Sequence, residues 1–268
     1  YEILIGLVGS EMCIRDRGFC AYIEQNGKKL LLDTGASNLF AENAEKLNID
    51  LKDIDFAVLS HAHYDHANGM EKFFEINRKA PFYLQEGCGE NCYFKKGFIR
   101  KYIGIPKGIT KKYQDRIKYV SGVYTVADGI YLVSHSTPHL EQIGKKEMMY
   151  QKTKLGWKPD NFCHEQSLVL DTDGGLVIFN SCSHGGVVNI INEVKAAFPN
   201  KKITALIGGF HIFKHPEAEI RELAKLIKET GIQRIYTGHC SKERGYRILR
   251  EELGDMAGQF YVGMELEF

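Results

Sequence analysis

The sequence predicts an α+β fold in a single domain, on three observations. An Asn26-Gly27 turn joins two strand-like stretches, which is the strongest short-range signal for an antiparallel hairpin. A second hairpin is predicted around Asp173-Gly174-Gly175, so the chain falls into two halves of similar pattern. Beyond it, amphipathic helices alternate with short apolar strands. The chain has 268 residues, of which 44% are hydrophobic, and no Pro/Gly/Ser-rich linker divides it, so it can bury one large core.

The spacing of apolar residues predicts each element in turn. Residues 18–35 form the first hairpin, and residues 38–47 form a helix because their apolar side chains fall on one face. A short buried strand at 56–60 is followed by a helix at 69–77. The second half is predicted to contain a hairpin at 166–181, helices at 187–198, 216–231 and 241–254, strands at 203–209 and 234–238, and a terminal strand pair.

Two segments do not follow this pattern. Residues 1–17 begin without Met and do not lead smoothly into the region that starts at Gly18. They are either a strand followed by a loop or a non-native segment from cloning or a sequencing adapter, and both interpretations stay open. The single domain is therefore expected over 18–268. Residues 85–166 show no regular periodicity, and we expect an irregular region there that determines which substrate enters the site.

The composition excludes several classes of function. The net charge of +1 argues against a general nucleic-acid-binding protein, which usually carries a strong basic excess. No stretch approaches the roughly 18 to 20 apolar residues of a membrane span, and the start does not resemble a signal peptide. Seven cysteines without a repeating frame suggest reduced thiols. We therefore expect a cytoplasmic protein without a nucleic-acid or membrane partner.

Three histidines and an aspartate fall within six residues directly after the apolar run at 56–59. They are His61, His63, Asp65 and His66. Imidazole nitrogens and carboxylate oxygens are the usual ligands of zinc, manganese or iron in hydrolytic sites. One histidine alone would be interpreted as a core or surface residue, but this density predicts a metal site. Closely spaced side chains in a loop can point to two metals, so His61 and His63 can bind one metal and Asp65 and His66 the other.

The cluster His61-Ala62-His63-Tyr64-Asp65-His66 resembles the H-x-H-x-D-H signature of the metallo-β-lactamase superfamily. Other elements of that family follow in order along residues 18–268, namely the Asp33-Thr34-Gly35 turn, His184 and His239. The phrases HEQSLVL, NSCSHGGVVNII, ALIGGFHIF and GHCSKERGYRIL resemble one branch of the family. This branch contains the 7,8-dihydropterin-6-methyl-4-(β-D-ribofuranosyl)aminobenzene 5′-phosphate synthase-like proteins.

The resemblance implies a four-layer αβ/βα sandwich, in which two mixed β-sheets lie face to face and the metals lie along one edge. It implies two divalent metal ions, with zinc expected and manganese or iron as alternatives. The first would be held by His61, His63 and His184, and the second by Asp65, His66 and His239. Asp33 would accept hydrogen bonds that orient the ligand loop, as ligating histidines generally require.

The chain departs from the family at the bridging carboxylate. An Asp is usual after the strand before the last ligand, but the sequence there is Gly208-Gly209-Phe210-His211. A neutral imidazole does not supply a bridging negative charge, so weaker binding of the second metal and a one-metal resting state both remain open. Asp65 and His211 are the candidates for moving a proton in catalysis.

Some further residues carry weaker expectations. His164 and Glu165 are candidates for substrate binding from a loop between the halves. Cys182 and Cys240 neighbour two predicted ligands, but burial for packing is the favoured interpretation of both. Residues 95–118 contain nine Lys or Arg against the single acid Asp115. This stretch is either a solvated surface, which is favoured, or a surface that attracts an anionic substrate.

The expected activity is that of a metal-dependent hydrolase acting on an ester or phosphoester. A metal lowers the pKa of bound water from 15.7 toward about 7, so that hydroxide forms at neutral pH and attacks the substrate. The substrate would be a small metabolite, phosphorylated or not, with a phosphoester or cyclic ester bond. The alternatives are a sulfur dioxygenase with a single iron, an RNA-processing nuclease, and a binding protein without catalytic activity.

Overall fold

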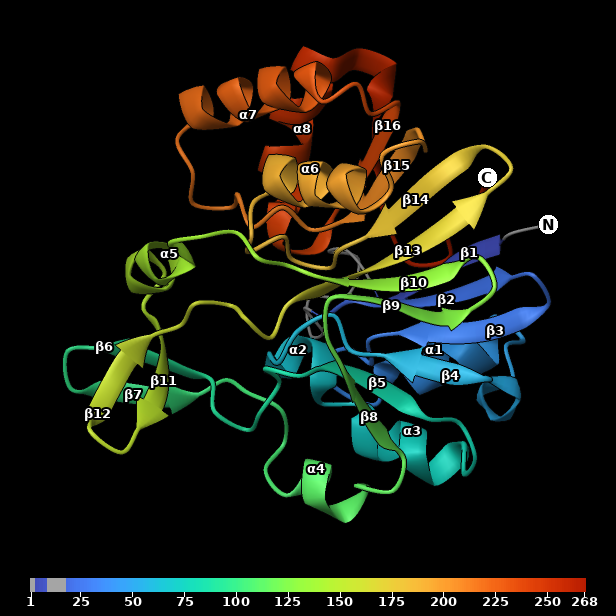
Figure 1. Cartoon of the computed structure of the whole chain (residues 1–268), viewed down its shortest axis with the longest axis vertical. Helices are drawn as coiled ribbons and strands as arrows, with labels where there is room; N and C mark the ends of the chain where they lie inside the picture. Colours follow the sequence, from blue (N-terminus) through green and yellow to red (C-terminus); the bar gives the residue numbers. More distant parts are fainter. Residues whose placement is uncertain (1–2, 9–17) are drawn as a thin grey trace.

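The computed structural model describes residues 3–8 and 18–268 (Figure 1). In these residues two seven-stranded mixed sheets lie face to face. The first sheet contains β1 (Ile3–Val8), β2 (Cys20–Gln25), β3 (Lys28–Leu32), β4 (Phe56–Val58), β5 (Phe82–Gln85), β8 (Ile117–Val120) and β18 (Glu265–Glu267). The second contains β9 (Val123–Ala127), β10 (Ile130–Ser134), β13 (Gln166–Thr172), β14 (Gly175–Phe179), β15 (Ile203–Gly208), β16 (Arg234–Thr237) and β17 (Ala257–Gln259).

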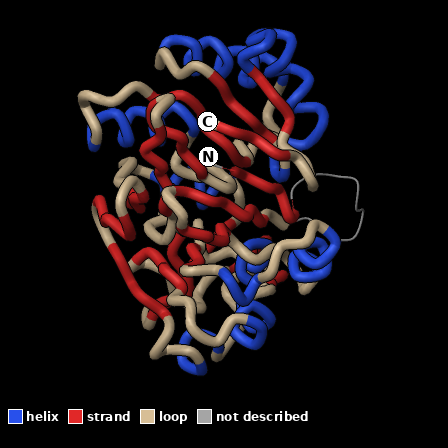
Figure 2. Tube along the Cα trace, turned by 90° about the vertical axis from the view of Figure 1, so that its right-hand side faces the viewer, coloured by secondary structure: helices blue, strands red, loops and turns tan. Residues whose placement is uncertain are grey.

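Helices cover the outer faces of both sheets, as Figures 1 and 2 show. The helices are α1 (Leu39–Lys46), α2 (Tyr64–Ala67), α3 (Met70–Ile76), α4 (Ile109–Lys112), α5 (Leu140–Lys146), α6 (Val187–Ala197), α7 (Glu217–Glu229) and α8 (Lys242–Leu253). One apolar core lies between the two sheets, a second beneath α1 and α3, and a third beneath α6, α7 and α8. The predicted four-layer sandwich is therefore confirmed.

Alternating side chains explain why the central strands are apolar throughout. In β14, Leu176 and Ile178 pack against the helices, whereas Val177 and Phe179 pack against the opposite sheet. A strand covered on both faces has no solvent side that would require polar residues. The predicted first hairpin is also present, because Asn26 and Gly27 both adopt the positive φ values that a two-residue turn needs.

The predicted terminal strand pair is wrong. β17 pairs in parallel with β16 at the edge of the second sheet, whereas β18 pairs with β1 at the edge of the first. The apolar pattern identifies both segments as strands but does not determine their partners. The partner of β18 lies within the first 17 residues, and residues 1–2 and 9–17 of that segment are outside the described part of the chain.

The region 85–166 contains regular structure that the sequence pattern did not indicate. It includes a separate four-stranded sheet of β6 (Tyr93–Lys96), β7 (Ile99–Tyr102), β11 (Met149–Thr153) and β12 (Gly156–Pro159). These strands are only four or five residues long, too short for a clear period. The small sheet projects beside the sandwich near α5 (Figure 1). Within the described ranges, none of the helices is long and apolar enough to cross a membrane.

Candidate metal centre

The predicted ligands lie where strands end at one edge of the sandwich. β14, β15 and β16 run parallel to one another, so the loops after them leave the second sheet at the same edge. These loops carry His184, His211 and His239. The loop after β4 enters from the first sheet with His61, and α2 begins directly after His63. The fold thus brings all six predicted ligands to one place.

The first predicted group of ligands converges on a common point. One ring nitrogen from each of His61, His63 and His184 lies within 4.8 Å of the others. The three rings are at most 4% exposed, and their Nε2 atoms have no hydrogen-bond partner among the described residues. Buried ring nitrogens are normally paired, so three unpaired ones facing each other fit a divalent metal ion.

The second predicted group converges in the same way. His66 Nε2 lies 3.2 Å from His239 Nε2, and Asp65 Oδ2 lies 3.7 Å from His239 Nε2 and 4.0 Å from His66 Nε2. His66 Nδ1 donates a hydrogen bond to the carboxylate of Asp33. His66 Nε2 therefore presents a lone pair toward His239 Nε2. A cation between the three side chains accounts for this approach, and the donor set fits zinc, manganese or iron.

Asp33 fixes the loop that carries the first ligands. Its carboxylate is fully buried and accepts hydrogen bonds from the Ser60 amide, the Ser60 hydroxyl and His66 Nδ1, each at 2.7 Å. The bond from Nδ1 sets the tautomer of His66 and leaves Nε2 free to bind a metal. These contacts support the orienting role proposed for Asp33. Ser60 Oγ also lies 2.9 Å from His61 Nδ1, so Ser60 connects a second ligand, His61, to Asp33.

Strained backbone accompanies the ligands. Four non-glycine residues at the centre adopt left-handed conformations, namely Asp33, Ser183, His211 and His239, with φ between 49° and 60°. This conformation is unfavourable for L-residues and persists only where surrounding contacts enforce it. Its concentration at the strand ends supports a functional role for this edge.

Burial keeps the first group neutral in the metal-free chain. Burial and the neighbouring histidines lower the pKa of His61 and His184 well below 6.5, and burial, His164 and other neighbours lower the pKa of His63 to about 3. On unfolding below pH 6.5 these rings take up protons, so the unfolded state binds more protons than the folded state. The free energy of unfolding must then fall as the pH falls.

The metal-free chain is accordingly expected to lose stability steeply below pH 6.5. Each of the three rings contributes about 1.4 kcal/mol per pH unit, which gives an upper bound of about 4 kcal/mol per unit. Urea unfolding in the presence of a chelator at pH 6.5, 5.5 and 4.5 measures this slope, because groups with a raised pKa, such as His211, oppose it mainly above pH 6.5. An unfolding free energy that stays constant over this range would contradict the burial of three neutral histidines.

His211 lies beside the first group and has a partner that the sequence did not indicate. Its ring centroid is 4.6 Å from that of His184, and its Nε2 is 3.5 Å from Glu147 Oε2. Burial opposes protonation, but Cys240 and Glu147 outweigh it and raise the pKa of His211. Both residues line a cavity of about 340 Å³ between α5 and α7, which also reaches His184. Glu147 follows α5 in the region without periodicity, so no sequence signal marked it.

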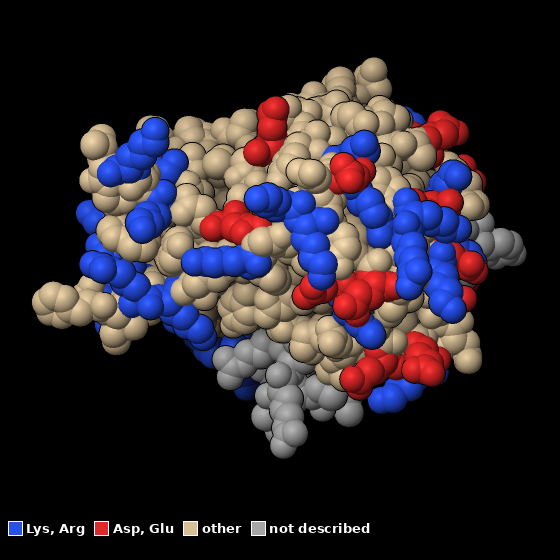
Figure 3. Space-filling view, turned by 90° about the horizontal axis from the view of Figure 1, so that it is seen from below, with Lys and Arg blue, Asp and Glu red and all other residues tan. Residues whose placement is uncertain are grey.

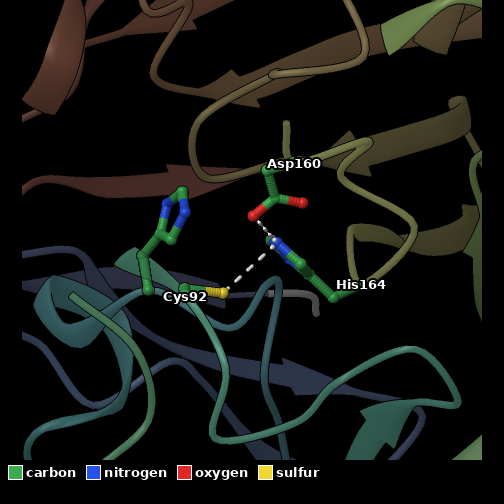
Figure 4. A group of neighbouring side chains, drawn as sticks. Cys92, Asp160 and His164 are labelled. Atoms are coloured by element: carbon green, nitrogen blue, oxygen red, sulfur yellow. Dashed lines mark hydrogen bonds and ion pairs between the residues drawn. The ribbon is translucent and has the colours of Figure 1, made fainter. Parts of the chain in front are cut away.

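His164 contacts the first ligand loop. It is 1% exposed, and its Nδ1 accepts a hydrogen bond of 3.2 Å from the Ala62 amide, between two ligands. Its Nε2 lies 3.2 Å from Asp160 Oδ2 and 3.7 Å from Cys92 Sγ (Figure 4). Because Nδ1 accepts, Nε2 carries the proton and donates it to Asp160. The neutral tautomer that this network fixes has no free lone pair, so we interpret the cluster as support for the loop.

Glu165 and Gln166 continue this support into both ligand loops. The Glu165 carboxylate, also 1% exposed, accepts from the backbone amides of His184 and Gly185 at 2.8 Å each. The Gln166 amide donates to the Ser60 carbonyl and its side chain to the Leu59 carbonyl. These contacts occupy the polar groups of the two residues predicted to bind substrate, His164 and Glu165. For both we therefore propose a positioning role in place of substrate contact.

The basic stretch at 95–118 divides among several roles. Arg116 donates to the carbonyls of Phe74, Asn77 and Ala80, so it holds the chain locally. Lys101 lies 5.8 Å from the centroid of the Tyr64 ring, next to a predicted ligand. In the view from below, Lys and Arg gather at the end where the four-stranded sheet lies, whereas the rest of that face mixes both charges (Figure 3). Attraction of an anionic substrate stays a prediction.

Comparison with known proteins agrees with this geometry. The sequence pattern of the Metallo-beta-lactamase superfamily matches residues 14–144. The chain is 28% identical to the 7,8-dihydropterin-6-methyl-4-(beta-D-ribofuranosyl)-aminobenzene-5'-phosphate synthase of Methanocaldococcus jannaschii, over 93% of this chain and 88% of that protein.

Solved structures show the same likeness. Tm1679, a metal-dependent hydrolase of the beta-lactamase superfamily, is 26% identical with a TM-score of 0.83, over 100% of this chain and 99% of that one. A diphosphatase from the PhnP family shares the fold at 14% identity and a TM-score of 0.60, over 100% of this chain and 98% of that one. The ligand motif, the four-layer sandwich and these similarities agree: the chain has the fold of the metallo-β-lactamase superfamily and matches its sequence pattern over residues 14–144.

Proposed function

We propose that this protein is a hydrolase with two metal ions that cleaves an ester bond, most simply a phosphoester, in a small metabolite. The observation that carries the proposal is the convergence of unpaired, buried ring nitrogens in the first group, beside a second group in which the donor atoms of Asp65, His66 and His239 approach one another. The similarity to Tm1679 supports hydrolysis. The name of the relative from Methanocaldococcus jannaschii describes a 5'-phosphate compound, which supports a phosphorylated substrate.

The cavity beside His184 and His211 suggests how a substrate lies. Its walls are mainly apolar, formed by Ile143, Val187, Phe210, Ile212, Leu223 and Leu226. The charged lining residues are Lys146 and three acids, Glu147, Glu219 and Glu222. A substrate with an apolar or aromatic part in this cavity would present its reactive group to the metal ligands. Metals bound at the ligands would attract an anionic group, whereas the three glutamates of the wall favour a neutral or cationic part deeper in the cavity.

The roles of the residues follow from their positions. Divalent metals, when bound, supply the Lewis acidity that polarises the substrate and activates water. Asp65 is the only carboxylate among the six ligands, and its position between two histidines suits it to hold or accept a proton. His211, supported by Glu147, lines the cavity and is placed to donate a hydrogen bond to substrate.

Metal content and turnover together test the proposal. The chain is purified without chelator, beside a His61→Ala/His63→Ala variant, and its metals are quantified by elemental mass spectrometry. We expect about two zinc or manganese ions per chain, their loss in the variant, and hydrolysis of a phosphomonoester, phosphodiester or lactone by the wild type alone. One iron per chain would favour the dioxygenase alternative instead. No metal after reconstitution would contradict any metalloenzyme function.

A further inference from the structure

We propose that the Cys182 thiolate is a ligand of the metal centre and lies between the two metal positions, where it takes the place of the missing bridging carboxylate. The inference rests on the proposed metal centre but concerns a residue outside the six predicted ligands. It replaces the packing role that the sequence favoured for this cysteine. Its evidence is the position of Sγ, the local donor geometry and the charge of the site.

Cys182 adjoins the ligands of both groups. Its side chain is 3% exposed in the loop after β14, and its Sγ lies 3.3 Å from His66 Nε2. The same sulfur lies within 4.8 Å of a ring nitrogen of His61, from the first group, and of His239, from the second. It is also within that distance of His184 and His211. A single sulfur atom therefore lies among the donors of both metals.

The distances around the second group match a four-donor site. Tetrahedral zinc binds nitrogen and oxygen at about 2.0 Å and sulfur at about 2.3 Å, so neighbouring donors lie about 3.3 to 3.8 Å apart. The observed separations are 3.2 Å between the Nε2 atoms of His66 and His239, and 3.3 Å between Cys182 Sγ and His66 Nε2. Asp65 Oδ2 completes the set at 3.7 Å from His239 Nε2. Cys182 supplies the fourth donor.

The charge of the site favours a further anionic ligand. The six predicted ligands bring one negative charge, that of Asp65, to a buried site for two divalent ions. The loop at 208–209 cannot carry an acid, because a Cβ at Gly208 would lie 1.9 Å from the Asn180 carbonyl oxygen. A Cβ at Gly209 would lie 2.4 Å from Cys240 Sγ. A thiolate at Cys182 supplies the charge from the facing loop, and zinc binds thiolates well.

Cys240 provides a matched control within the same site. Its Sγ lies 3.6 Å from Cys182 Sγ, and it accepts a hydrogen bond of 3.2 Å from the His211 amide. A metal-bound thiolate can also accept an amide hydrogen bond, so we assign the bridging role to Cys182 on its distances to the ligands. The two cysteines differ in that Sγ of Cys182 approaches the first group, through His61 and His184.

Cobalt substitution tests the inference without depending on turnover. Metal-free protein is titrated with Co²⁺, and absorption spectra and stoichiometry are recorded for the wild type, Cys182→Ser, Cys182→Asp and Cys240→Ser. We expect a thiolate-to-cobalt charge-transfer band in the wild type and in Cys240→Ser, and its absence in both Cys182 variants. Binding of the second ion should weaken about 10- to 100-fold or more in Cys182→Ser. In Cys182→Asp, where a carboxylate replaces the thiolate, two ions should bind without the band.

Each contrary result has a distinct meaning. A wild type that binds two cobalt ions without a thiolate band would overturn the inference and leave the proposed hydrolase intact. A band that persists in Cys182→Ser and disappears in Cys240→Ser would assign the ligand to Cys240 and overturn it as well. A wild type that binds no cobalt would contradict both the inference and the proposed function. Thermal unfolding of each variant in chelator shows whether it remains folded.

Discussion

Asp65→Asn is expected to abolish binding of the second metal ion and to lower kcat/KM by about 1,000-fold, while one ion remains bound. The substitution keeps the shape of the side chain but removes the only carboxylate among the six ligands. A 1,000-fold loss corresponds to about 4 kcal/mol of transition-state stabilisation, which is the scale expected when a metal that stabilises developing charge is lost. Metal stoichiometry and steady-state kinetics on the same preparation measure the two effects together.

The control for this prediction is Asp115→Asn, which removes an exposed carboxylate from the basic stretch. It should retain both metals and full activity. If Asp65→Asn keeps two ions with unchanged kcat/KM, then Asp65 does not serve the second metal, and the assignment of that group is wrong. Loss of both ions in Asp65→Asn would indicate that the two positions fill only together.

The sequence predicted the metal ligands best, because their residue types identify the chemistry and their positions at the ends of strands determine where they meet. Four of the six proposed ligands stand in one turn, and the other two follow apolar strands, so the ends of the strands determine where they meet. Parallel β14, β15 and β16 bring His184 and His239 to one edge, and this parallel order is predictable from alternating helices and strands. The left-handed backbone at Asp33 has no comparable sequence signal.

The supporting residues were harder to predict because their partners are far away in the sequence. Glu147 and Asp160 lie in the region of short strands, where no periodicity fixes which way a side chain points. Cys182 was recognised as a neighbour of His184, but a separation of two residues does not determine whether Sγ points to the core or to the ligands. The partners of β17 and β18 were missed for a similar reason, since pairing depends on the three-dimensional path of the intervening loop.

Glu165 is expected to contribute most to the stability of the metal centre among the residues that bind no metal. Its carboxylate accepts two buried backbone amides, those of His184 and Gly185, at 2.8 Å. Burial raises the pKa of this carboxyl, but the two amides and nearby histidines favour its charged form. In Glu165→Ala both amides lose their acceptor, at about 1 to 3 kcal/mol each, so the free energy of unfolding should fall by about 4 kcal/mol. Glu165→Gln keeps one acceptor oxygen and should lose about half as much.

Metal affinity separates a positioning role for Glu165 from simple destabilisation. The loop that Glu165 holds carries His184, so zinc affinity should fall about 10- to 100-fold in Glu165→Gln even when the variant is fully folded. Zinc titration against a competing chelator and urea unfolding of the metal-free protein measure the two quantities independently, with Glu229→Ala as the exposed control. Reduced stability with unchanged zinc affinity would show that Glu165 supports the fold without positioning the ligand. Because the backbone of His184 is already fixed before metal binds, we expect the loss to appear mainly as faster zinc dissociation.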